Sequence, residues 1–210
     1  MQAESISTPV IYVVDDDTDV CAGLSALFQS VGLCATTFGS TIDFLKYQRP
    51  ERTSCLILDV RLPGLSGLDF QAELAKAAVN IPIIFITGYG DIPMSVKAIK
   101  SGAVEFLTKP VREQDLLDAV RVALDRDRAK RELDTKVRDL RARFGALSTR
   151  EQQVMSLVCA GLMNKQAAAE IGVSEVTVKV HRHNVMKKLG ARSLAELVRM
   201  ADSLGIPCQI

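Results

Sequence analysis

The stretch CLILDVRLPGLSG, residues 55–67, decides the expected fold of the first half of the chain. Its first four residues are apolar and predict a strand that is buried on both faces, as in a parallel sheet. Asp59 follows where this strand leaves the sheet, just before a loop rich in Pro and Gly. A carboxylate in that place loses solvation free energy unless another group pairs with it. The partners of Asp59 are therefore the first thing to find in the rest of the sequence.

The neighbouring sequence repeats the same strand pattern in alternation with helical segments. We expect strands over residues 10–17, 33–38, 55–59, 81–88 and 104–110, and helices over 19–32, 40–48, 67–77 and 91–102, with a fifth helix after Pro110. Strands that alternate with amphipathic helices predict a doubly wound α/β fold, in which helices cover both faces of a five-stranded parallel sheet. Ligands of such sheets bind beyond the carboxyl ends of the strands.

Polar residues gather at those predicted strand ends. They are Asp15, Asp16, Asp17, Asp59, Thr87, Thr108 and Lys109. Carboxylates that converge repel one another and raise each other's pKa, and a hard cation such as Mg²⁺ or Mn²⁺ removes that cost. The cluster of Asp15, Asp16 and Asp59 therefore predicts a metal site that serves phosphoryl chemistry. Asp59 is the expected nucleophile, with Lys109 neutralising phosphate oxygens and Thr87 donating a hydrogen bond to one of them.

The charge distribution separates the front of the chain from the back. Residues 1–125 hold 10 Lys/Arg against 16 Asp/Glu, residues 126–144 hold 8 against 4, and residues 145–210 hold 8 against 5. The whole chain of 210 residues has a net charge of only +1. An acidic front and a basic back predict two modules with different partners, and the partner of the basic module is expected to be polyanionic.

A long helix is expected to join the two modules. Between Glu113 and about Arg143 the sequence has no Gly or Pro, and residues 125–132 are charged all round. We favour one continuous helix over a break near residue 126. The apolar residues Leu133, Val137, Leu140 and Phe144 fit either a short seam of a paired coiled coil or a helix lying on its own neighbours, because one short seam is too little for a heptad signal.

Four short helices are expected in the basic module after Gly145. Ser148 and Glu151 form a capping-box pattern, and Asn164 and Ser174 are placed to cap the next two helices. The third helix, SEVTVKVHRHNVMKKLG, has an apolar side and a polar side and is typical of a recognition helix in the major groove. We expect Lys179 to donate to guanine, Val180 to contact a thymine methyl group and His183 to donate or accept. Residues predicted to contact phosphate are Lys165, Thr177, Arg182, Lys187 and Lys188.

The motifs VVDDD, LILDVRLPGLSG, IFITGYGD and GAVEFLTKP resemble the receiver domain of two-component response regulators, particularly the FixJ-like group, over about residues 9–125. The resemblance implies a flavodoxin-like receiver in which Asp59 is the phosphoacceptor and Asp15 and Asp16 hold the metal. It also implies that the backbone carbonyl of Arg61 is a third protein ligand. Asp17 stands where related receivers often have Glu.

The same resemblance implies a conformational switch. Thr87 and Lys109 match the switch and phosphate-binding positions of receivers, and Phe106 matches the aromatic residue whose rotamer follows Thr87. Taken by itself, Phe106 fits a place in the core of the fold better, and only the surrounding pattern supports the switch role. The bond between Lys109 and Pro110 matches a cis peptide of the family.

Residues 145–203 resemble the LuxR-type DNA-binding domain, on LSTREQQV and AGLMNKQAAAEIGVSEVTVKVHRHNVMKKLGARS. The two resemblances divide the chain into a receiver (1–125), a helical linker (126–144) and an all-α helix-turn-helix domain (145–210). They imply a phosphorylation-controlled transcriptional regulator, an activator more often than a repressor. Its partners would be a cognate sensor histidine kinase, promoter DNA, RNA polymerase and, once phosphorylated, a second copy of the chain.

Two other classes of function stay open in the sequence. A phosphatase would turn over phosphate at Asp59, but such enzymes commonly carry a second Asp two residues later, where this chain has Arg61. We therefore expect no enzyme beyond uptake and hydrolysis of the chain's own phosphoryl group. The other alternative is a constitutive DNA-binding regulator that is not controlled by phosphorylation.

We expect the chain to be a cytoplasmic protein. Hydrophobic residues make up 48% and charged residues 24%, and no run approaches the length of a membrane span. The N-terminal sequence MQAESISTPV is unlike a secretory signal, so no membrane partner is expected. The five cysteines are scattered without a CxxC pair, which predicts buried thiols in a reducing compartment.

Overall fold

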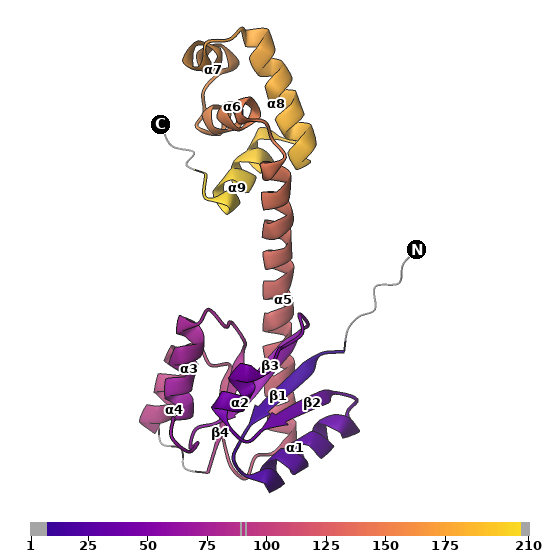
Figure 1. Cartoon of the computed structure of the whole chain (residues 1–210), viewed down its shortest axis with the longest axis vertical. Helices are drawn as coiled ribbons and strands as arrows, with labels where there is room; N and C mark the ends of the chain where they lie inside the picture. The colour runs from indigo at the N-terminus through magenta and orange to yellow at the C-terminus, as the bar shows by residue number, and fades with distance from the viewer. Residues whose placement is uncertain (1–7, 89, 91, 207–210) are drawn as a thin grey trace. The chain divides into compact units, whose positions relative to one another are not determined.

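The computed structural model describes residues 8–88, 90 and 92–206. They divide into two units, residues 1–131 and 132–210, which are described separately. The first unit contains the five expected strands and the helices between them (Figure 1). The strands are β1 (Val10–Val14), β2 (Cys34–Phe38), β3 (Ser54–Asp59), β4 (Ile83–Thr87) and β5 (Glu105–Thr108). The helices are α1 (Thr18–Ser30), α2 (Thr41–Lys46), α3 (Gly67–Lys76), α4 (Ile92–Lys100) and the long α5 (Glu113–Gly145).

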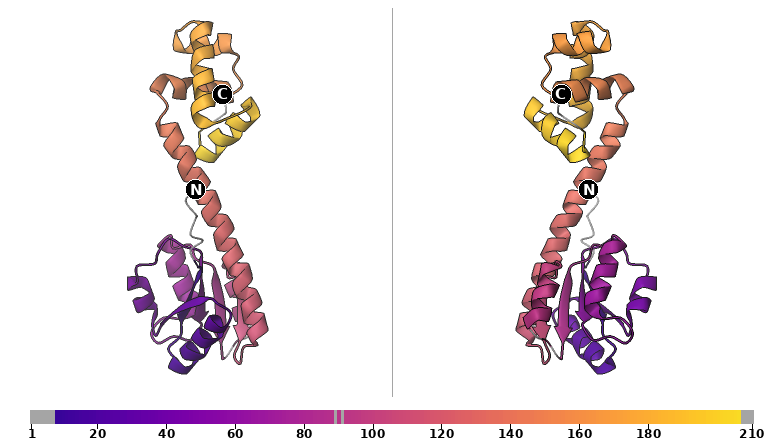
Figure 2. Two further views of the ribbon diagram at one scale, coloured as in Figure 1. Left: turned by 90° about the vertical axis from the view of Figure 1, so that its right-hand side faces the viewer. Right: turned by 90° about the vertical axis from the view of Figure 1, so that its left-hand side faces the viewer.

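The sheet has the doubly wound topology that the sequence predicts. All neighbouring strands are parallel and follow the order β2-β1-β3-β4-β5. Alternate residues of each strand point to opposite faces, so the apolar runs build two separate cores. Tyr12, Leu56 and Phe85 pack beneath α2, α3 and α4, whereas Ile11, Ile57 and Ile84 pack beneath α1 and α5. Figure 2 shows the two helical layers on either side of the sheet.

The α5 helix is continuous from Glu113 to Gly145, as expected, with no break near residue 126. Within residues 125–132, which are charged all round, Asp127 is only 2% exposed. Its carboxylate accepts the backbone N–H of Ser54 at 2.9 Å and the Nε–H of Arg131 at 2.5 Å. Those bonds satisfy a buried charge that would otherwise be costly, and they fix α5 against the first residue of β3.

The second unit contains the four short helices expected after Gly145. They are α6 (Thr149–Cys159), α7 (Asn164–Ile171), α8 (Glu175–Leu189) and α9 (Leu194–Leu204). Ser148 and Glu151 form the expected capping box, and Ser174 caps α8. The predicted cap at Asn164 is wrong by one residue: Met163 is the N-cap, and its backbone N–H donates to Gln166 Oε1.

The apolar seam of α5 contributes mainly to the core of this second unit. Leu140 and Phe144 pack against the cluster built by α6, α8 and α9, while Leu133 is 61% exposed. Leu140 and Phe144 therefore lie on the helix's own neighbours, whereas pairing of two chains through the seam stays a prediction.

Two of the four described cysteines are less buried than expected. Cys55 and Cys159 are buried, whereas Cys21 is half-buried and Cys34 is exposed. No disulfide joins these four described residues, and Cys208 lies outside the described part of the chain. Within residues 8–88, 90 and 92–206, none of the helices combines the length and the apolar character that a membrane span requires.

Candidate functional site

The sheet positions the predicted site residues at one rim. Asp15 follows β1, Asp59 is the last residue of β3, Thr87 ends β4, and Lys109 follows β5. The strands are parallel and in register, with Asp59 opposite Ile86 of β4. Their carboxyl ends therefore meet at the same edge, and side chains that are far apart in the sequence come together there.

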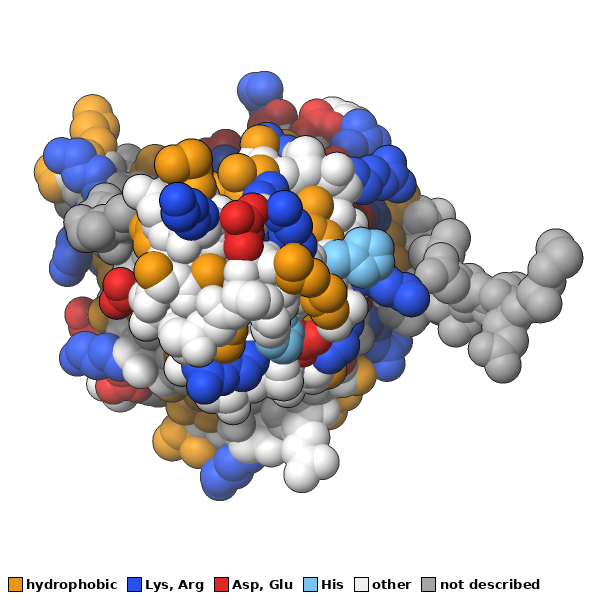
Figure 3. Space-filling view, turned by 90° about the horizontal axis from the view of Figure 1, so that it is seen from above, with side chains coloured by type: hydrophobic (Ala, Val, Ile, Leu, Met, Phe, Trp, Pro, Cys, Tyr) orange, Lys and Arg blue, Asp and Glu red, His pale blue; other side chains and the backbone are white. Residues whose placement is uncertain are grey.

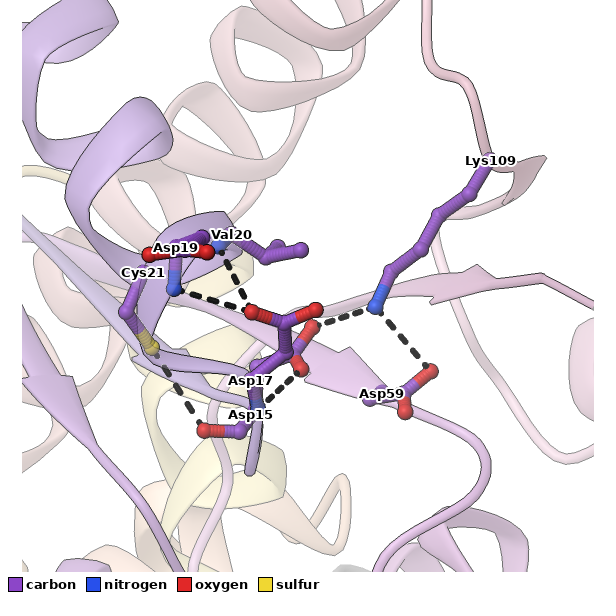
Figure 4. Close-up of polar contacts among 7 residues, drawn as sticks. All are labelled: Asp15, Asp17, Asp19, Val20, Cys21, Asp59 and Lys109. Atoms are coloured by element: carbon purple, nitrogen blue, oxygen red, sulfur yellow. Dashed lines mark hydrogen bonds and ion pairs between the residues drawn. The ribbon is translucent and has the colours of Figure 1, made fainter.

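Lys109 is the positively charged partner of Asp59. Its Nζ atom lies 2.6 Å from Asp15 Oδ2 and 3.8 Å from Asp59 Oδ1 (Figure 4). Asp15 is 1% exposed and Asp59 is 6% exposed, so one ammonium group serves two buried carboxylates. The shorter contact goes to Asp15. Asp59 Oδ1 is buried and accepts no hydrogen bond from the described residues of the chain, which leaves that oxygen available for another ligand.

The carboxyl group of Asp59 has a raised pKa. Burial is the main cause because it removes water from the charged form, and the neighbouring Asp15 raises the pKa further. The Lys109 ammonium and the backbone N–H groups of Val60 and Arg61 oppose the shift. The net result is a carboxylate that is more basic than an exposed aspartate and is held in one place by hydrogen bonds.

The acidic cluster fits a divalent cation. Asp15, Asp16 and Asp59 each offer one carboxylate oxygen, and these oxygens all lie within 4.8 Å of one another. Carboxylate oxygens are the ligands that hard cations prefer, and a cation would offset the repulsion among them. Asp17 has a different task, because its side chain accepts the backbone N–H groups of Asp19 and Val20 and caps α1.

Thr87 and Phe106 lie beside each other near the same rim. Thr87 is fully buried, and Phe106 is half-buried with its ring centroid 6.2 Å from that of Phe85. A Cβ atom added to Gly90 would lie 2.8 Å from Phe106 Cε1 and 3.2 Å from Thr87 Cγ2. The glycine therefore leaves the space that these two side chains occupy.

Two glycines, Gly90 and Gly67, were not identified from the sequence as residues of the site. A Cβ on Gly67 would lie 3.1 Å from Val60 Cα and would also overlap the carbonyl oxygen of Asp59. The close approach of α3 to the strand end requires a residue without a side chain. The Pro- and Gly-rich loop marks a turn there, but only the packing identifies which glycine is indispensable.

The bond between Lys109 and Pro110 is cis, as expected. The roles predicted for Thr87, Phe106 and the Arg61 carbonyl remain predictions.

The predicted DNA-contacting residues lie on α7 and α8 of the second unit. Val178, Val185 and Leu189 are buried against α6, α7 and α9, which leaves the opposite side of α8 exposed. Lys179, Val180, His183 and Lys187 are on that exposed side, and Lys165 is exposed on α7. Thr177 and Arg182 are half-buried. Ser174 Oγ and Thr177 Oγ1 are 2.8 Å apart, and Arg182 Nη1 donates to Asn164 Oδ1 at 3.3 Å.

Lys188 has a contact that the sequence did not predict. Its Nζ atom donates to Glu151 Oε2 at 2.7 Å, and Glu151 is only 4% exposed. Hydrogen bonds from Lys188 and Ser148 hold the pKa of the Glu151 carboxyl below its usual value. Lys188 thus ties α8 to the start of α6, and its predicted contact with phosphate would have to be made from this position.

Comparison with known proteins divides the chain into the same two domains, a receiver and a LuxR-type DNA-binding domain. Residues 11–121 match the family model described as the response regulator receiver domain, and residues 145–201 match the model for bacterial regulatory proteins of the luxR family. The Nodulation protein W of Bradyrhizobium diazoefficiens is 57% identical over 97% of this chain and 89% of its own length. The transcriptional regulatory protein FixJ of Rhizobium meliloti is 40% identical over 91% of this chain and 94% of its own.

Solved structures agree with these relatives. The response regulator StyR matches 93% of this chain and 99% of its own, with a TM-score of 0.81 and 49% sequence identity. Full-length FixJ from B. japonicum matches 94% of this chain and 98% of its own, with a TM-score of 0.56 and 38% identity.

These matches define a class of regulators in which a receiver domain is joined to a LuxR-type DNA-binding domain. The chain belongs to the two-component response regulators of this class and is a transcriptional regulator like FixJ. The family resemblance read from the sequence is thereby confirmed.

Proposed function

We propose that phosphorylation of Asp59 by a cognate sensor histidine kinase switches this cytoplasmic regulator between two states of DNA binding. The observation that carries the proposal is the rim of the sheet. There, one ammonium group is shared by two buried carboxylates, and among the residues that the structure describes none donates a hydrogen bond to Asp59 Oδ1. Such a group is placed to attack an incoming phosphorus atom.

The phosphoryl group would come from a phosphohistidine of the kinase. An Asp59 carboxylate oxygen forms the new bond to phosphorus while the bond from phosphorus to the histidine nitrogen breaks, and the electron pair leaves with the imidazole. Lys109 would stabilise the negative charge on the phosphoryl oxygens. The chain then catalyses only its own phosphorylation and hydrolysis and has no separate substrate.

Mg²⁺ or Mn²⁺ would be held by Asp15, Asp16, Asp59 and the carbonyl of Arg61, and would neutralise charge on the phosphoryl oxygens. The acidic cluster within 4.8 Å supports this assignment. In the phosphorylated state Thr87 would donate a hydrogen bond to a phosphoryl oxygen. Phe106 packs beside Thr87 and would adjust to the space that it leaves, which changes the surface around residues 92–110.

The changed surface would favour pairing of two copies. A pair presents two copies of α8 to a palindromic site, and the second contact is strengthened by effective concentration. Bound at a promoter, the pair would act on RNA polymerase, with activation as the expected output.

Beryllofluoride with Mg²⁺ tests the proposal on the full chain. We expect the mass measured by light scattering to double and the affinity for duplex DNA to rise. Asp59→Asn is the control and should show neither change. Unchanged mass and DNA affinity in the wild type would instead support the alternative, a constitutive DNA-binding regulator that phosphorylation does not control.

A further inference from the structure

An ion pair occupies the first turn of the recognition helix α8. Lys179 Nζ lies 3.0 Å from Glu175 Oε1, and the two side chains are 60% and 45% exposed. The residues are four positions apart, so they project from the same side of the helix. Both side chains are exposed and lie on the flank of α8, next to the side that buries Val178, Val185 and Leu189. The pair therefore belongs to the surface that would face the major groove.

A carboxylate on this surface needs an explanation. DNA phosphates repel it, and it offsets the charge of the lysine beside it. The rest of the surface is also far from uniformly basic, since Val176 is 68% exposed and Val180 is 53% exposed. Figure 3, a view from above Figure 1, shows acidic, basic, histidine and apolar side chains side by side. Such a surface is poorly suited to binding phosphate without regard to sequence.

The major groove offers a carboxylate one good partner. The N4 amino group of cytosine donates a hydrogen bond there, and Glu or Asp accepts it, whereas guanine presents the O6 and N7 acceptors that suit Lys. Glu175 and Lys179 place an acceptor and a donor within one helical turn. The pair therefore matches a C·G base pair, or two neighbouring pairs that present a donor and an acceptor.

We propose that Glu175 is a specificity-determining residue of this regulator. Its carboxylate accepts a hydrogen bond from a cytosine N4 amino group at the proper site. On other sequences the Glu175 carboxylate holds Lys179 away from phosphate. There the DNA phosphates repel the carboxylate, and no hydrogen bond from cytosine offsets that repulsion. The inference rests on DNA binding through α8 and names a base that this helix reads.

The first test selects sequences from a duplex pool with a randomised core. The full chain, activated with beryllofluoride, is compared with Glu175→Ala and with Asp202→Asn, which removes the same charge from an exposed position on α9. We expect the wild type and Asp202→Asn to select cytosine at one position of each half-site. Glu175→Ala should lose that preference by about 10-fold while it keeps the rest of the motif.

The second test measures binding to a single unselected duplex at several salt concentrations. Glu175→Gln keeps the length of the side chain and releases Lys179 for phosphate. We expect tighter binding, and a plot of log K against log[salt] that is steeper by about 0.9. Far-UV circular dichroism checks that each variant is folded.

Either test can overturn the inference. An unchanged motif in Glu175→Ala would show that Glu175 reads no base. The same gain in non-specific affinity with Asp202→Asn would show that only the total charge of the protein matters. A wild-type pool without any enriched sequence would be a different failure, because it would remove sequence-specific binding itself and the inference with it.

Discussion

The rim of the receiver and the exposed side of α8 achieve function in opposite ways. At the rim, Asp15, Asp59 and Lys109 come from three different strand ends, and both carboxylates are buried. On α8, Glu175 and Lys179 are exposed and are held together by a single helical turn. A site for covalent chemistry needs its groups preorganised by the fold. A surface that reads DNA needs groups that the partner can still reach.

The rim of the receiver and the exposed side of α8 also differ in what they contribute to the stability of the fold. The receiver buries carboxylates with like charges, so its site lowers the stability of the fold until a cation is bound. The ion pair on α8 is exposed and contributes little to stability. Substitutions at the rim should therefore change both chemistry and stability, whereas those on the exposed side of α8 should change binding alone.

The largest expected effect is the loss of phosphorylation in Asp59→Asn. Asparagine keeps the shape of the side chain but provides no carboxylate oxygen that can form an acyl phosphate. We expect no phosphate incorporation from acetyl phosphate, measured by intact-protein mass spectrometry. Glu73→Gln, at an exposed position on α3, is the control and should be labelled like the wild type. Labelling of Asp59→Asn would identify another phosphoacceptor.

The second effect is stabilisation of the receiver by Mg²⁺. Binding to the folded state alone adds about 2.7 kcal/mol at 100 times the dissociation constant. The chain has no Trp, and its tyrosines, Tyr12, Tyr47 and Tyr89, all lie in the receiver. Tyrosine fluorescence therefore follows urea unfolding of that unit in the full chain. Addition of EDTA should reverse the gain, and Asp59→Asn should reduce it. An equal gain in Asp59→Asn would place the cation elsewhere.

The third effect is a loss of stability in Lys188→Met. It is an exception to the rule that substitutions on the exposed side of α8 change DNA binding alone. Lys188 was expected to contact phosphate, but it pairs with the buried Glu151. Loss of the ammonium leaves a buried carboxylate short of a partner, which should cost the second unit about 1–3 kcal/mol. Lys187→Met is the matched control on the exposed side and should stay within about 0.5 kcal/mol.

Amide hydrogen exchange of α6 and α8 in the full chain measures this difference. Faster exchange in Lys188→Met than in Lys187→Met is the expected result. Equal protection, together with equally weakened DNA binding, would return Lys188 to the set of phosphate contacts.

The same contrast explains what the sequence could predict. The order of strands and helices, and the convergence of Asp15, Asp16, Asp59 and Lys109, follow from parallel strands whose carboxyl ends share one edge. Lys188 and Glu151 are 37 positions apart in the sequence, and their contact joins helices α8 and α6. Helical periodicity places Lys188 on the surface, but it cannot tell which neighbouring helix the side chain reaches.

Asp127 and Gly90 show the same limit. The run DRDRAKRE has the composition of a solvated helix, and only the position of β3 beneath α5 buries Asp127. Gly90 is important because the Phe106 ring lies where its Cβ would be. Both depend on tertiary packing between segments that are distant in sequence or carry no periodic signal.

The smallest expected effect is the pH dependence that Asp59 gives to the receiver without metal. Its pKa is raised in the folded state, mainly by burial, so the folded chain binds more protons than the unfolded chain between the ordinary and the raised pKa. Stability must therefore fall as the pH rises through that window. Lys109 and two backbone N–H groups offset part of this cost, which keeps the effect small.

Asp59→Asn removes the titration. We expect the variant to be more stable than the wild type at neutral pH in EDTA, and the advantage to disappear as the pH falls below the ordinary range of an aspartate. Tyrosine fluorescence during urea unfolding measures the difference, with Glu73→Gln as the control. An advantage that stays constant with pH would mean that the cost of Asp59 is steric and not electrostatic. The reason given for a cation at the rim would then no longer hold.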